Sequence, residues 1–357
     1  MKSPSRQSLW LRLQSGGLVE GEIPPAEIAE SPWYVRVMLG VAGWIGSLFL
    51  LGFVGAGFAF VMENAIAALV VGGLVSGGAY AIFKARQYSD FFTQFGLAVG
   101  LAGQMMLIYG LFEMFNHNES LVYGLIFVIE ALLTLLMPNF IYRVLSSLAA
   151  ALALTFALHS AGVYGLASGF LAAGFALVWL QDVRWVRFSE ICQPAGYGLA
   201  FSLLYYKAGI FWGRWIWWSR SAGTNWLSQN APWLGKALIL IVFVVVVIVL
   251  LKRMQIIIAS RSGIAALAAA GLAIAAAFTA PGLGQAVLIL IIGFSVCNRV
   301  LLGIGLLASG AFLSNYYYLL QSTLLHKSLL LISIGAVLLI SRVLVRTWLP
   351  LPVERAS

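Results

Sequence analysis

The sequence predicts an all-α, polytopic membrane protein: a transmembrane helical bundle of about 12 spans with both termini in the cytoplasm. The chain has 357 residues, of which 62% are hydrophobic and only 9% are charged. A soluble core of this size could not bury so much apolar surface. The apolar runs are long and continuous, without the alternation that is typical of an outer-membrane β-barrel. Lys and Arg gather mostly in the links between these runs.

Each of twelve apolar segments is expected to cross the membrane as one helix, because about 20 helical residues span a hydrocarbon core of ~30 Å. In chain order they are 34–60, 65–83, 91–113, 119–137, 141–159, 163–180, 192–206, 235–251, 259–279, 283–297, 299–318 and 326–346. The pair 283–297 and 299–318 is the least regular, since its first member is short and the link is tight. Eleven spans, or a re-entrant hairpin at this pair, is the alternative.

Polar segments flank the bundle. Residues 1–32 form a short cytoplasmic segment, in which LWLRLQ after Ser8 predicts an amphipathic helix that ends at Gly16. The bundle takes residues 33–348, and residues 349–357 form a cytoplasmic tail. The first segment is too small to be a catalytic domain, so we expect the function to lie in the bundle or its loops.

The basic residues predict the orientation. With the N-terminus inside, all but five of the 21 Lys and Arg fall in inside segments. The five outside are Lys207, Arg214, Arg220, Lys236 and Lys327. The short outside links, at 61–64, 114–118, 160–162 and 280–282, have no Lys or Arg. This pattern favours N-in and C-in. Because the charge marks topology, the net charge of +9 does not indicate a nucleic-acid partner.

The segment Leu121–Met137 carries the candidate functional site. Apart from Tyr123, its one ionisable residue is Glu130, near the middle of the segment. A carboxylate at that depth is costly and must be paired, hydrated or protonated. Tyr123, Glu130 and Thr134 share one helix face, which we expect to look into the bundle.

Gln104, in the preceding apolar run, is the expected partner of Glu130. The short link Glu113–Glu119 makes the two helices antiparallel neighbours, and counting equally from it places Gln104 and Glu130 at nearly equal depth. The sequence therefore predicts a Gln104–Glu130 hydrogen bond, with Gly100 and Gly103 letting the two backbones approach closely. The functional interpretation is a proton or cation site. The alternative is a protonated, hydrogen-bonded carboxyl that stabilises helix packing.

A Trp-rich external loop, 207–234, is the second unusual feature. It holds half of the chain's Trp, and its candidate site residues are Trp212, Trp215, Trp217, Trp218, Arg214 and Arg220. Trp prefers the membrane interface, so we expect a helix lying on the outer face with its Arg side chains toward lipid phosphates. The alternative is external haem or ligand handling, because WGRWIWWSR is similar to the Trp-rich loop of cytochrome c maturation proteins that present haem. It lacks the Asp that follows the Trp cluster in those proteins.

Catalytic and metal-binding motifs are not found. The sequence has no Gly-rich phosphate loop, nucleophile elbow, HExxH or paired catalytic carboxylates, so we expect no catalytic residue, metal or cofactor. An enzyme is disfavoured, with an intramembrane lipid-modifying enzyme as the alternative. Cys192 and Cys297 have no CxxC or zinc spacing and are expected to be small buried residues.

Several stretches together resemble a known family. They are PWYVRVMLGVAGWIGSLFLLGF from Pro32, GLAVGLAGQMMLIYGLFE from Gly96, IEALLTLLMPNFIYRVLSSLAAALAL from Ile129 and QPAGYGLAFSLL from Gln193. They resemble a bacterial multipass inner-membrane family of unknown function, usually encoded beside a GDYXXLXY-domain membrane protein. Trp44, Gln104, Glu130 and Arg143 match positions that stand out in it. The resemblance implies an inner-membrane location and a GDYXXLXY-domain partner. The protein is thus expected to be a component of a membrane complex or a small-solute or proton-linked permease.

Overall fold

The computed structural model describes residues 6–16, 63–85, 90–115, 118–180, 188–208, 226–255 and 282–319, together with a few single positions elsewhere. Within these residues every regular element is helical, in agreement with the predicted all-α class. The ten α-helices are α1 Arg6–Ser15, α3 Ala65–Ala85, α4 Asp90–Met114, α5 Glu119–Leu136, α6 Phe140–Ser160, α7 Ala167–Trp179, α8 Ser189–Ala208, α9 Trp226–Arg253, α11 Leu283–Ser295 and α12 Arg299–Leu319. A short 3₁₀ helix, η2, spans Tyr164–Leu166.

Six of these helices, α3, α4, α5, α6, α9 and α12, are long and apolar enough to cross a membrane. The chain is therefore a multipass membrane protein. The helices α7 and α11 are apolar but have 13 residues each, or ~20 Å of rise, which is shorter than a hydrocarbon core. The expected segments 34–60, 259–279 and 326–346 lie outside the described residues.

The helix boundaries follow local chemistry. Asn118 and Asn139 cap α5 and α6, accepting hydrogen bonds from the backbone N–H of Leu121 and Tyr142 at 3.2 and 3.0 Å. Such caps satisfy backbone donors that have no partner within the helix. Pro138 separates the two helices, because proline disfavours a helical conformation in the residue before it. A helix, α1, is present where the N-terminal helix was predicted, but it starts before Ser8 and ends at Ser15, and its amphipathic character stays a prediction.

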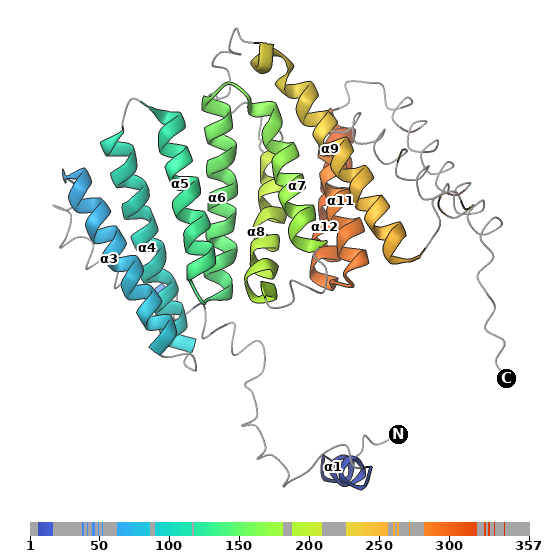
Figure 1. Cartoon of the computed structure of the whole chain (residues 1–357), viewed down its shortest axis with the longest axis horizontal. Helices are drawn as coiled ribbons and strands as arrows, with labels where there is room; N and C mark the ends of the chain where they lie inside the picture. The colour runs from blue at the N-terminus through green and yellow to red at the C-terminus, as the bar shows by residue number, and fades with distance from the viewer. Residues whose placement is uncertain are drawn as a thin grey trace.

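The helices α3 to α6 stand side by side, and each runs in the opposite direction to the one before it (Figure 1). We call the end of the bundle where α3 and α5 finish and α4 and α6 begin the basic end. It carries Lys84 and Arg143, and the last turn of α9 adds Lys252 and Arg253. The helices pair most tightly as α3 with α4, and as α5 with α6. These two helical hairpins approach each other over short stretches only.

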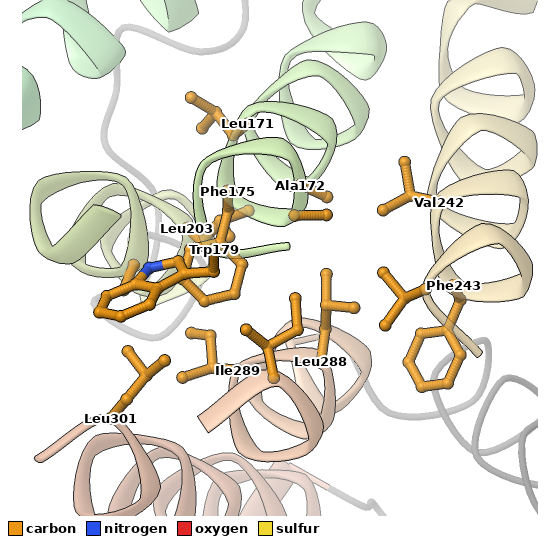
Figure 2. Packing of buried hydrophobic residues seen from close by; sticks show 14 of the residues in the cluster. Leu171, Ala172, Phe175, Trp179, Leu203, Val242, Phe243, Leu288, Ile289 and Leu301 are labelled. Atoms are coloured by element: carbon orange, nitrogen blue, oxygen red, sulfur yellow. The ribbon is translucent and has the colours of Figure 1, made fainter. Parts of the chain in front are cut away.

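The largest apolar core lies in the other half of the bundle, among α7, α8, α9, α11 and α12 (Figure 2). Phe175, Phe243, Ile289 and Leu301 are almost completely buried there. Close approach near this core depends on glycine: a Cβ on Gly235 of α9 would overlap the carbonyl of Gly165 in η2. This half contacts the two hairpins through α6, which packs against both α5 and α8.

Candidate functional site

Glu130 faces the interior of the bundle. The buried residues of α5 are Val122, Ile126, Glu130 and Thr134, at a four-residue spacing, and the Glu130 side chain is only 2% exposed. The opposite face of α5 exposes the large apolar side chains Val128, Leu132, Leu135 and Leu136. The predicted inward face is thus confirmed for Glu130 and Thr134.

Glu130 is held by two neutral side chains from two other helices. The Nε2 atom of Gln104, on α4, donates a hydrogen bond to Oε2 of Glu130 at 2.9 Å. The predicted Gln104–Glu130 bond is therefore confirmed. The same Nε2 donates to Oγ of Ser146, on α6, at 2.5 Å, and Ser146 is itself a hydrogen-bond partner of Glu130. We call Gln104, Glu130 and Ser146 the polar triad.

Ser146 was missed by the sequence analysis, although a signal for it was present. Glu130 precedes Pro138 by as many residues as Ser146 follows it. In two antiparallel helices joined at this proline, the two side chains have equal depth. Counting residues equally in both directions from the connection between two helices pairs Gln104 with Glu130 on α4 and α5. The same count from Pro138 pairs Glu130 with Ser146 on α5 and α6.

The other two predicted site residues do not contact the carboxyl group. The Thr134 hydroxyl donates to the backbone carbonyl of Glu130, at 2.8 Å. Tyr123 is half-buried and stacks on Phe156, with 5.3 Å between ring centroids, while its ring meets Phe112 edge-on at 5.4 Å. Tyr123 therefore belongs to an aromatic group two turns along α5 from Glu130.

The predicted role of two glycines was wrong. Gly103 does not bring α4 to α5: a Cβ there would overlap Ser76 and the carbonyl of Gly72, both on α3. A Cβ on Gly100 would overlap the ring of Tyr142, on α6, and would also meet Ala79 of α3. The physical reason is that α4 makes its closest backbone approach to α3, and contacts α5 through longer side chains, among them Gln104 and Phe112.

Apolar clusters enclose the polar triad on both sides along the helix axes. The basic-end cluster consists of Ala79, Phe83, Leu97, Met137 and Tyr142. The far cluster, beyond the triad from the basic end, consists of Leu111, Val122, Ile126 and Ala153. Glu130 lies six residues, or ~9 Å, from the basic end of α5. The other end of α5 is eleven residues away, so Glu130 lies nearer the basic end of this helix.

The chemistry available here is that of a single carboxyl group. It can hold or release a proton, and the neighbouring amide and hydroxyl can donate to it without adding charge. Among the described residues, no three His, Cys, Asp or Glu side chains come together in a group that could hold a metal ion. Burial among neutral partners makes ionisation of Glu130 costly unless water reaches it.

The remaining predicted sites are located as follows. Trp212, Trp215, Trp217, Trp218, Arg214 and Arg220 lie outside the described residues. Arg143 donates from Nη1 to the backbone carbonyl of Glu190, at 2.8 Å. Neither cysteine is in a disulfide, and Cys192 is half-buried whereas Cys297 is exposed. The prediction of a buried Cys297 was wrong because this residue forms the turn between α11 and α12, with a φ of 55°.

Comparison with known proteins places the chain in a family. No curated protein and no solved structure matches it. A family described as "Domain of unknown function (DUF4401)" matches residues 32–347, which include every described helix except α1. The match covers most of the chain, and the protein therefore belongs to this DUF4401 family of unknown function.

Proposed function

We propose that the protein is a small-solute or proton-linked permease of the bacterial inner membrane, with the polar triad as its proton site. The observation that carries the proposal is a carboxyl group that is 2% exposed and hydrogen-bonded to an amide and a hydroxyl. Ionisable residues inside membrane segments usually serve ion or substrate pathways.

The position of the triad supports this role. Gln104 belongs to the α3–α4 hairpin, whereas Glu130 and Ser146 belong to the α5–α6 hairpin. Ionised Glu130 needs water, and water reaches it only if the two hairpins separate. We call the arrangement in which the two hairpins are packed together closed. Protonated Glu130 is stable in this closed arrangement, because its hydrogen-bond partners there are neutral. Proton binding thus favours one of two arrangements, which is the requirement for coupling a proton to transport.

We further propose the full topology of about 12 spans, N-in and C-in. The basic end then faces the cytoplasm, and the location of Lys84, Arg143, Lys252 and Arg253 at that end supports this orientation. The segments 34–60, 259–279 and 326–346 supply the remaining spans.

Proton flux into liposomes tests the function. Purified protein is reconstituted with a pH-sensitive dye inside the vesicles, and a pH gradient is imposed with the membrane potential clamped. We expect Glu130→Gln, which keeps the size and a hydrogen-bonding amide, to reduce flux to the level of empty vesicles. The matched control is Glu119→Gln, which changes an exposed acid in the first turn of the same helix. Wild-type flux through Glu130→Gln would contradict the proposal.

A membrane complex is the second proposal. The family resemblance of the chain favours a GDYXXLXY-domain membrane protein as the partner, and the matched region, residues 32–347, contains all six of the long apolar helices. The contact is therefore expected on the bundle. Affinity purification in mild detergent from cells that make both proteins tests this. Recovery of the chain alone, with the partner present in the membrane extract, would contradict it.

A further inference from the structure

The two hairpins make two parallel contacts across their interface. The first is the bond from Gln104 to Ser146 within the polar triad. The second lies one helical turn closer to the basic end, where the Tyr142 hydroxyl donates to the backbone carbonyl of Gly100 at 3.3 Å. The residues of both contacts are four apart on α4 and on α6, so they lie on the same two helix faces.

Tyr142 fills the interface at this second contact. The residue is 0% exposed, and its ring meets Phe83 of α3 edge-on, with 6.0 Å between centroids. A Cβ on Gly100 would overlap the same ring, so the absence of a side chain at Gly100 makes room for it. The contact at 3.3 Å is at the long end of hydrogen-bond distances. The ring is thus well packed, while the hydroxyl holds α4 by a weak bond.

We propose that Tyr142 is the gate between the polar triad and the basic end of the bundle. The inference rests on the proposed proton site and assigns the residue that controls water access to it. In the closed arrangement, Tyr142 and the rest of the basic-end cluster exclude water from Glu130. When the α3–α4 hairpin moves away from α5–α6, the Tyr142–Gly100 bond breaks and water enters from the basic end.

Three features of the packing support a gate at this position. The α3–α4 and α5–α6 pairs are each tightly packed, whereas the interface between them is short. The basic-end cluster draws on α3, α4, α6 and Met137, the residue that follows α5, and contains one hydroxyl group among its five side chains. Met137 and Leu97 complete the cluster with flexible apolar side chains, which can adjust when the hairpins separate.

Cysteine accessibility at Ser146 tests the gate without measuring transport. Cys192 and Cys297 are first replaced by Ser, since neither is in a disulfide and the reagent could label their thiols. Ser146→Cys is then introduced one turn beyond Tyr142, and a membrane-impermeant thiol reagent is applied to each face of reconstituted vesicles in separate experiments. With Tyr142 present we expect slow labelling, because Ser146 is 0% exposed.

Two substitutions at Tyr142 then separate its ring from its hydroxyl. Tyr142→Ala should raise the labelling rate from the basic end on the order of tenfold or more, because it removes a buried ring. Tyr142→Phe keeps the ring and should raise the rate roughly two- to tenfold, the effect of one ordinary hydrogen bond on an opening equilibrium. The matched control is Tyr197→Phe, which removes a hydroxyl that accepts a hydrogen bond from Asn298 at 2.7 Å, outside this interface. It should leave labelling unchanged.

The outcomes distinguish this proposal from the proposed function. Unchanged labelling in both Tyr142 variants would overturn the gate, whatever the proton flux. Labelling that rises equally from both faces would also overturn it, since that result indicates general loosening. Wild-type proton flux in Glu130→Gln would refute the proposed proton site. The labelling rates would still show, independently, whether Tyr142 is the barrier to water.

Discussion

The hydrogen bond between Gln104 and Glu130 leads to a prediction about stability that does not depend on transport. We consider Gln104→Leu, Glu130→Leu and the double substitution. Leu has nearly the volume of either side chain and makes no hydrogen bond. Both residues are buried, at 5% and 2% exposure, so a partner left behind cannot recover its bond with water.

The magnitudes follow from the number of bonds that each change removes. Gln104→Leu removes the donor to both Glu130 and Ser146 and should cost about 2 kcal/mol, within the range for an unsatisfied buried polar group. Glu130→Leu leaves Gln104 bonded to Ser146 and should cost about 1 kcal/mol. In the double variant no amide or carboxyl group is left without its partner, and the remaining Ser146 hydroxyl can donate to a backbone carbonyl of its own helix. The double variant should therefore be no less stable than Gln104→Leu. The coupling energy is then about 1 kcal/mol, between the average and the maximum measured between membrane helices.

Reversible unfolding in detergent micelles, followed by circular dichroism, measures the free energy of unfolding of each variant. The matched control is Gln285→Leu, which changes another Gln at 5% exposure, on α11. Its cost should add to that of Glu130→Leu, because distant sites without shared partners are independent. If the costs of Gln104→Leu and Glu130→Leu also add, the two residues do not stabilise each other and the triad is not a unit.

Three further predictions test other parts of the structure. Gly100→Ala should destabilise the protein, since its Cβ meets the Tyr142 ring. Gly124→Ala, with no atom within 4 Å of its added Cβ, should instead stabilise the protein by up to ~1 kcal/mol. Thermal unfolding compares the two variants, and equal effects would contradict the packing at Gly100. A reporter enzyme that is active only outside the cytoplasm should be active when inserted at 160–162 and inactive when fused after residue 357; the reverse result would invert the proposed topology. Purified protein should show no haem absorbance after haem is added, and a haem band would favour the alternative function of the Trp-rich loop.

Much of the architecture could be predicted because it depends on local properties of the chain. Composition alone indicated membrane-spanning helices, and the expected segments 119–137 and 141–159 agree closely with α5 and α6. The Gln104–Glu130 bond could be predicted because a short link makes consecutive helices antiparallel and equates depth on either side of it. The same equal-depth argument across Pro138 places Ser146 beside Glu130, although Ser146 was not among the predicted site residues.

Lateral packing could not be predicted from local properties. The residues flanking Gln104 suggested that α4 packs on α5, but in the structure Gly103 faces α3 and Gly100 receives Tyr142 from α6. In lipid, the inner and outer faces of a helix are both apolar, so hydrophobicity does not indicate which face meets a neighbour. The pairing depends instead on where small residues on one helix meet large side chains on another, and that fit exists only once distant segments are assembled. The sequence by itself therefore determined that the chain forms membrane-spanning helices and that Gln104 lies level with Glu130, a buried acid. The tertiary structure decided which side chains enclose it, because close packing is a property of the assembled surfaces.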